Sequence, residues 1–316
     1  MLKLVLNRLL WGLATLAAVA MFIFAAVEAL PGDACTAYLG RAAQGTRLEN
    51  CRRDFGLDRP AVERFAEWAG GMLQGDLGHS MKRHKPIADV VLPRLRNTAL
   101  LALAAALVGI PVAIGLGVVA ALWRDRPPDV VVSTAAIMAM TLPEFVSATL
   151  LILVFSAWLG WSSGIATVNV NAPIAELLPA LPMPVIAVSL IMTAHILRMV
   201  RTSVIDVMAS EYVQMARLKG MPHRRIVWRY VLPNALLPTV NLVALTVAWL
   251  LGGVVVIEVV FNYPGIGRLS VDAVSDRDLP TVQCIALIMS AIYIVANLAA
   301  DILSLVLNPR LRTART

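Results

Sequence analysis

The sequence is poor in charged residues, in histidine and in cysteine. Only 15% of its 316 residues are charged and 59% are hydrophobic, whereas soluble domains carry about 25% charged residues. The four histidines are scattered, and neither a His-Glu-x-x-His motif nor a cysteine pair at metal-binding spacing occurs. The phosphate-binding pattern Gly-x-x-x-x-Gly-Lys-Ser/Thr is also missing. These absences argue against a soluble globular protein, a zinc enzyme embedded in the membrane and an ATPase.

Two of the three cysteines, Cys35 and Cys51, fall in one hydrophilic segment. If that segment faces an oxidising compartment, the pair can form a disulfide. Two unpaired cysteines in a polar loop are the alternative, because separation along the chain does not define the Cβ geometry. Cys284 lies within an apolar run and is expected to be a small packing residue.

Long apolar runs predict an all-α polytopic membrane protein. A helix of about 20 residues crosses the ~30 Å of hydrocarbon in a bilayer, and six runs qualify, at residues 9–27, 98–123, 130–159, 178–197, 235–257 and 281–300. The first run is longer than the ~7–15 residue core of a signal peptide, so a retained helix is favoured. Prolines in the runs predict kinks, either purely structural or lining a translocation path, at Pro111, Pro143, Pro182 and Pro184.

The distribution of cations between the runs predicts the orientation. With a cytoplasmic N-terminus, most basic residues fall inside, in residues 198–229 and at Arg124, Arg126, Arg310, Arg312 and Arg315, whereas the short outer loops carry Arg268 and Arg277. This is the positive-inside bias, so the net charge of +7 indicates no nucleic-acid partner. The predicted order is an N-terminal transmembrane helix (1–30), an extracytoplasmic segment of mixed charge (31–93), a core (94–307) and a cytoplasmic tail (308–316).

The most informative segment, residues 204–233, lies between two runs on the predicted cytoplasmic side. Residues 211–218 are good helix formers, Gly220 permits a bend, and Pro222 suits the first turn of a second helix. A basic helix here is, taken alone, more typical of a lipid-headgroup contact. For a soluble partner it offers packing area and polar contacts, from Tyr212, Val213, Met215 and Ala216 and from Arg217, Lys219, Arg224 and Arg225.

The order of residues in this segment resembles the coupling loop of ABC importer permeases. It carries Glu211, Tyr212, Ala216, Arg217, Lys219 and Gly220, then Ile226, and then Pro-Asn-Ala-x-x-Pro at residues 233–238. Other blocks resemble the dipeptide, oligopeptide and nickel permease branch, at residues 31–33, 55–60, 75–80, 93–98, 261–269, 277–283 and 308–310. Pro233 departs from that branch, which has Arg there, so the second helix is expected to end early. Residues 160–179 match no motif.

The resemblance implies a type I importer permease with a MetI-like fold, in which six transmembrane helices carry a cytoplasmic coupling helix pair. It implies a bacterial inner-membrane complex with a second homologous permease subunit, two ABC ATPase subunits that bind ATP and magnesium, and a periplasmic or lipid-anchored solute-binding protein. The chain itself would be no enzyme and would bind no cofactor or metal, its other partner being membrane lipid. The implied solutes are dipeptides or oligopeptides, with nickel complexes, glutathione or opine-like conjugates as alternatives.

Several further residues are candidates for function. Glu144 is expected either to face the pathway or to form a structural hydrogen bond, and Glu258 and Asp301 to lie at the interface or bond to neighbouring helices. The Gly- and Pro-rich residues 261–269 predict a bent loop; by the resemblance it is either a plain connection or an outer gate shaped by Tyr263, Pro264, Gly265 and Gly267. A secondary transporter is the alternative of a different class, although neither paired inverted repeats nor deep charged relay residues are evident.

Overall fold

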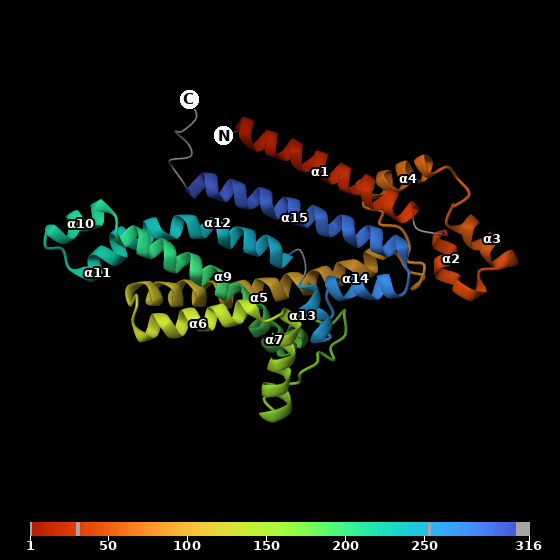
Figure 1. Ribbon diagram of the computed structural model, residues 1–316. Helices are drawn as coiled ribbons and strands as arrows, with labels where there is room; N and C mark the ends of the chain where they lie inside the picture. The colour runs from red at the N-terminus through yellow and green to blue at the C-terminus, as the bar shows by residue number, and fades with distance from the viewer. Residues whose placement is uncertain (1, 30–31, 252–253, 308–316) are drawn as a thin grey trace.

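The computed structural model describes residues 2–29, 32–251 and 254–307, so the predicted tail 308–316 and Pro31 lie outside the described residues. The described part is helical, with a single isolated β-bridge between His79 and Pro86 (Figure 1). The helices, in chain order, are α1 (Leu2–Glu28), α2 (Ala34–Leu39), α3 (Gly45–Asp54), α4 (Ala61–Gln74), α5 (Ile87–Leu122), α6 (Pro127–Thr141), α7 (Glu144–Leu151), α8 (Ile174–Leu177), α9 (Pro182–Met208), α10 (Glu211–Leu218), α11 (His223–Ile226), α12 (Leu232–Leu251), α13 (Val255–Val260), α14 (Ile266–Ser275) and α15 (Leu279–Leu307).

The membrane spans follow the predicted apolar runs. Five helical stretches are long and apolar enough to cross a bilayer, or six if one bent pair counts as a span. The five are Leu6–Glu28, Ile87–Leu122, Pro182–Met208, His223–Val247 and Leu279–Ile302. The all-α class with up to six spans is thereby confirmed.

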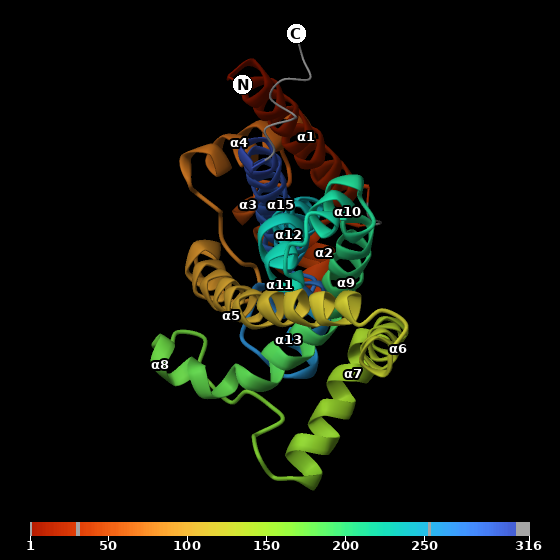
Figure 2. The same cartoon turned by 90° about the vertical axis from the view of Figure 1, so that its left-hand side faces the viewer.

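The third predicted run, residues 130–159, is not one continuous span. Helix α6 ends at Thr141, and α7 continues from Glu144 at an angle of 110°, through a π-helical stretch at Ile152–Trp158. Leu142 is extended, with φ −78° and ψ 128°, because the ring of Pro143 disfavours a helical residue before it and provides no N–H. The α7 arm therefore leaves the body of the molecule (Figure 2).

The other prolines do not interrupt helices. Pro111 lies within the continuous α5, where a kink stays a prediction. Pro182 and Pro184 lie in the first turn of α9, where a missing N–H costs nothing. Pro233 does not end the second helix of the predicted coupling segment early: α11 runs through a π-helical turn, Val227–Val231, directly into α12. Because α12 ends at Leu251, the predicted fifth span was placed too far along the chain.

Helix α5 packs most extensively against α9, and two glycines permit the close approach. An added Cβ at Gly109 would lie 2.2 Å from the Met192 Cε, and one at Gly117 would lie 2.7 Å from the Val200 Cβ and 2.8 Å from the Leu197 carbonyl oxygen. Small residues at a helix contact in this way are typical of membrane proteins. The pair forms the rigid centre between the two ends of the molecule.

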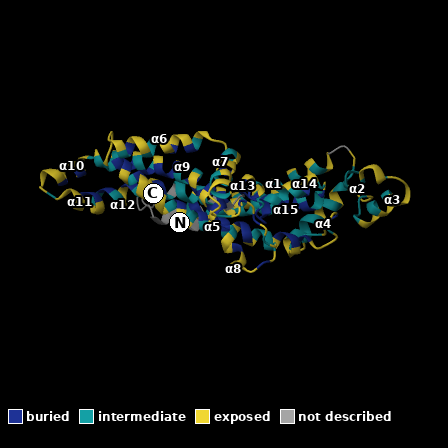
Figure 3. Cartoon of the chain, turned by 90° about the horizontal axis from the view of Figure 1, so that it is seen from below, coloured by how far each residue is buried: buried dark blue, intermediate teal, exposed yellow. Residues whose placement is uncertain are grey.

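The opposite ends of the molecule are formed by α10 and α11 and by α2 to α4 (Figure 1). Both α3 and α10 are largely exposed (Figure 3). Helix α4 follows Pro60. Its aromatic side chains Phe65 and Trp68 pack on Phe24 of α1, with ring centroids 5.3 and 5.9 Å away.

Candidate functional site

The predicted coupling segment is a compact helix pair that extends α9 beyond the other helices. Helix α10 begins at Glu211 after the turn Ala209–Ser210, and α11 begins at His223 after Pro222. Gly220 joins them with φ +71°, and an added Cβ there would meet no atom within 4 Å. The requirement for glycine is therefore conformational, since other residues rarely adopt this left-handed backbone.

One face of the α10–α11 helix pair packs against the rest of the chain. Val213, Ala216 and Ile226 are buried in the core cluster that also contains Val204 and Val231. These contacts fix α10 and α11 to the ends of α9 and α12. The prediction that Val213 and Ala216 supply packing area for a partner is therefore wrong: they anchor the segment to its own spans.

The other face of α10 is apolar and exposed. Tyr212, Met215 and Leu218 are 44%, 54% and 81% exposed, and their spacing of three residues places them on one side of the helix. Exposed Glu211 and Lys219 flank them. Sequence reasoning omitted Leu218, although its spacing from Met215 was available as a signal.

At the other end of the spans, the segment after α12 is organised around the buried carboxylate of Glu258. The Thr98 hydroxyl of α5 donates to its Oε1 at 2.5 Å, and the Arg268 N–H donates to its Oε2 at 3.0 Å. The Thr98 oxygen in turn accepts the Ile266 N–H at 2.9 Å. Glu258 thus bonds to a neighbouring helix, which was one of the two predicted alternatives. Its hydrogen bonds hold the start of α14 against α5.

The four predicted gate residues lie together and are all buried. The Tyr263 hydroxyl donates to the Asn97 carbonyl at 2.9 Å, and the Asn97 amide donates to the Pro264 carbonyl at 2.9 Å. An added Cβ would lie 2.2 Å from the Glu258 carboxyl at Gly265 and 2.8 Å from the Val255 Cα at Gly267. The bent loop is therefore a packed structure and not a slack connection.

Residues 160–179, which match no motif, are hydrogen-bonded to the loop at residues 261–269 mainly through main-chain atoms. The Ala166 N–H donates to the Phe261 carbonyl, and the Asn262 amide donates to the Ala166 carbonyl, both at 2.8 Å. Arg96 donates to the Ala172 carbonyl at 2.8 Å. Main-chain contacts of this kind place few demands on residue type, which explains the missing sequence signal.

A second buried carboxylate, Asp278, joins two of the motif blocks. It accepts hydrogen bonds from the Ser80 hydroxyl, from the Met81 N–H at 3.1 Å and from the Thr281 hydroxyl at 2.8 Å. The block at residues 75–80 and the block at residues 277–283 are therefore two halves of one contact.

The hydrophilic segment after α1 is held by Cys35 and Cys51, whose sulfur atoms are 1.98 Å apart. Beside them, Asp33 caps α2 and pairs with Arg52 at 2.5 Å. Burial raises the pKa of Asp33, but hydrogen bonds from Thr36 and Arg52 outweigh it and lower the pKa below its ordinary 3.8. The link and the ion pair both join α2 to α3.

Glu144 lies apart from both groups, as the half-buried first residue of α7. Among the described residues its carboxylate has no hydrogen-bond or ion-pair partner, so the predicted structural hydrogen bond is not formed within them. Asp301, by contrast, pairs with Arg8 at 2.5 Å. The described residues contain no group of three or more His, Cys, Asp or Glu side chains arranged for a metal.

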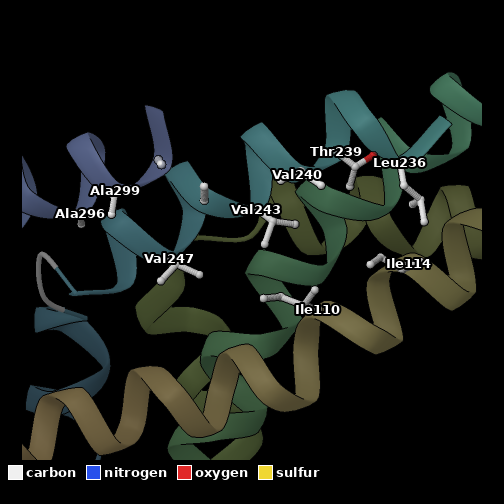
Figure 4. Close-up of a pocket in the computed structure, with 11 residues that line it drawn as sticks. Ile110, Ile114, Leu236, Thr239, Val240, Val243, Val247, Ala296 and Ala299 are labelled. Atoms are coloured by element: carbon white, nitrogen blue, oxygen red, sulfur yellow. The ribbon is translucent and has the colours of Figure 1, made fainter. Parts of the chain in front are cut away.

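An apolar cavity of about 490 Å³ lies between α5, α12 and α15 (Figure 4). Ile110 and Ile114 point into it from α5, and Val243 and Val247 from α12. The Thr239 hydroxyl at its wall is buried without a hydrogen-bond partner. With so few polar groups, the cavity cannot replace the hydrogen bonds that a peptide backbone makes with water.

Comparison with known families covers nearly the whole chain. The family described as "Binding-protein-dependent transport system inner membrane component" matches residues 113–313, and the N-terminal family of the same systems, "Binding-prot-dependent transport system membrane comp, N-term", matches residues 1–102. The chain belongs to this permease family. The resemblance drawn from its motifs is confirmed, and the permease is an inner-membrane transport component.

Similar proteins include the glutathione transport system permease protein GsiC of Escherichia coli strain K12 and that of Shigella flexneri serotype 5b. Each is 36% identical over 312 residues, which is 99% of the permease described here and 99% of the relative. A crystal structure of an amino acid ABC transporter with histidines is 18% identical, with a TM-score of 0.47, over 71% of this chain and 93% of that one. That score is too low to support any conclusion.

Proposed function

We propose that this permease forms half of the translocation pathway of an ABC importer for short peptides or similar solutes. Its full-length similarity to glutathione transport permeases favours solutes of the size and polarity of glutathione within that class. A second, homologous permease completes the pathway. Delivery by a solute-binding protein is expected from the family description.

The observation that carries the proposal is the two-faced helix α10. Its inner residues, Val213 and Ala216, are packed into the core, whereas Tyr212, Met215 and Leu218 are exposed beside charged residues. An apolar patch with a polar rim is the ordinary composition of a protein docking site. Because the inner face is fixed to α9 and α12, a push on the outer face moves those spans.

The partner at this face is an ATPase subunit, one beneath each permease. ATP and magnesium bind there, so this chain contributes mechanical coupling and no hydrolysis. The segment 217–229 carries several cations and no acid, and the complementary rim of the ATPase groove is therefore acidic. Nucleotide-driven closure of the two ATPases would move both coupling segments and rotate the attached spans.

The proposal requires α10 and α11 in the cytoplasm, with both termini on the same side. The disulfide-linked helices at the opposite end of the molecule then face the periplasm, where a disulfide is stable. The loop around Glu258 lies on that side and forms the outer gate, next to the solute-binding protein. Glu144 on α7, whose carboxylate has no partner among the described residues, is available to the pathway.

The test is substitution on the exposed face. Leu218→Asp should release the ATPase subunits during purification and abolish ATP-driven uptake into vesicles, since burying an unpaired carboxylate in an apolar contact costs roughly several kcal/mol. Gly220→Pro or Glu211→Lys should impair coupling without loss of membrane insertion. Leu73→Asp is the matched control, because Leu73 is 91% exposed on α4 at the opposite end. Normal ATPase retention by Leu218→Asp would refute the proposed docking face.

A further inference from the structure

The cytoplasmic end of α6 is tied to α9 by a buried ion pair that no sequence motif indicated. Arg201 donates through Nε and Nη2 to the two carboxylate oxygens of Asp129, at 2.6 and 2.7 Å. The side chain of Asp129 is only 3% exposed. Such a two-pronged pair fixes both the distance and the relative rotation of the groups that carry it.

The remaining hydrogen bonds of Asp129 complete a local unit. The Asp125 N–H and the Ser133 hydroxyl each donate to it at 3.0 Å, so the carboxylate also closes the turn between α5 and α6. Asp125 holds a left-handed backbone there, with φ +59°. The pair therefore joins the α5–α6 turn, the first turns of α6 and the final part of α9.

Arg201 lies close to the coupling segment, so the ion pair can connect that segment to α6. Arg201 lies near the end of α9, which stops at Met208, and α10 begins at Glu211. The rest of the α6–α9 contact is an apolar cluster, with Ala136 and Ala139 beside Ala194 and Leu197, and one weak hydrogen bond from Arg198 to the Met140 sulfur at 3.6 Å. Small apolar surfaces pack closely but have no directional bonds that oppose sliding, whereas the ion pair does.

We propose that Asp129 and Arg201 are positioning residues that transmit the movement of the coupling segment from α9 to α6. Through α6, the movement reaches the bend at Pro143 and the α7 arm that carries Glu144. Without the pair, α9 would follow the ATPase while α6 lagged behind. This inference rests on the proposed function, because it assumes that α10 is driven from the cytoplasm.

The experiment compares variants in the complete reconstituted transporter, measuring solute transported per ATP hydrolysed. Arg201→Lys keeps the charge but loses the two-pronged geometry, and it should lower that ratio about fivefold or more. Asp129→Asn should do the same. Asp129→Glu, which keeps a carboxylate for Arg201, should lower the ratio less than Asp129→Asn. Arg126→Lys is the control, because Arg126 in the α5–α6 turn is exposed and its side chain forms no hydrogen bond or ion pair within the described residues.

Assembly is measured in parallel, as the amount of complex that copurifies. A purely structural role predicts that transport and hydrolysis fall together with the amount of complex, leaving the ratio unchanged, and that result overturns the proposal. If Asp129→Asn fails to assemble, Arg201→Lys and Asp129→Glu decide. If the Asp129 and Arg201 variants leave the ratio unchanged while Leu218→Asp still releases the ATPase, only the transmission role is rejected. If Leu218→Asp retains the ATPase, the proposed function itself is rejected.

Discussion

Gly265→Ala tests whether the Glu258 carboxylate organises the outer loop. Gly265 has φ −102° and ψ −179°, a backbone that any residue adopts, so alanine meets no conformational penalty. Its Cβ, however, would lie 2.2 Å from both the carboxyl carbon and Oε1 of Glu258. Since carbon atoms approach to about 3.5 Å at best, the carboxylate must withdraw by more than 1 Å.

Withdrawal of the Glu258 carboxylate lowers the free energy of unfolding, because it breaks the hydrogen bonds from the Thr98 hydroxyl and the Arg268 N–H. Each bond to a charged group contributes about 1.5–3 kcal/mol, so the variant should lose roughly 3–6 kcal/mol of stability. For a chain of this size, such a loss lowers the thermal midpoint by roughly 10 °C, measurable as loss of the monodisperse peak of the purified complex.

The double variant identifies the cause. Once Glu258→Ala has removed the carboxylate, adding Gly265→Ala should cost less than about 1 kcal/mol, because the clash no longer exists. Gly115→Ala is the control, since an added Cβ there meets nothing within 4 Å, and its midpoint should not fall. Equal destabilisation by Gly265→Ala with and without Glu258 would refute the reasoning.

Further predictions concern the other parts of the molecule. Gly117→Val should prevent correct packing of α5 on α9, because its Cβ would lie 2.7 Å from the Val200 Cβ; the yield of folded permease should fall sharply, unlike that of Gly115→Ala. Cys35 and Cys51 should resist alkylation until a reductant is added, and mass spectrometry of untreated protein should find their peptides linked. Because the pKa of Asp33 is lowered, its stabilisation is present above the ordinary 3.8 and is lost as the pH falls below about 4. Limited proteolysis of residues 32–93 should therefore quicken in acid, and Asp33→Asn should remove this pH dependence. A cysteine at Lys219 should react with an impermeant thiol reagent only from the cytoplasmic side.

Hydropathy and turn chemistry predicted the helices well, because bilayer thickness dictates the length of an apolar run. The break at Pro143 was expected as a kink, but its 110° angle was not, since the direction of α7 depends on packing against α9 and α13. At Pro182 a kink was predicted, but this proline is the first residue of α9. Local sequence does not distinguish a proline that bends a span from one that begins a helix.

In the candidate sites, too, features set by neighbouring residues were predicted from the sequence, whereas contacts between residues far apart in the chain were not. The order of residues from Glu211 to Ile226 predicted a coupling segment, yet its pattern did not separate the anchored Val213 from the exposed Leu218, since both are apolar. The partners of Glu258 and Asp278 lie far away in the chain, at Thr98 and Ser80. Such pairings arise from tertiary structure and leave no spacing to detect.

The bend between α6 and α7 has a consequence for hydration. The fifteen residues of α6 rise about 22 Å, short of the ~30 Å hydrocarbon thickness. At its end the Met138 carbonyl accepts from the Leu142 N–H at 3.2 Å and from the Thr141 hydroxyl at 2.9 Å, whereas Pro143 has no N–H to offer the next carbonyl. Lipid tails cannot solvate a carbonyl without a donor. We therefore expect this bend to face water or the proposed second permease rather than lipid.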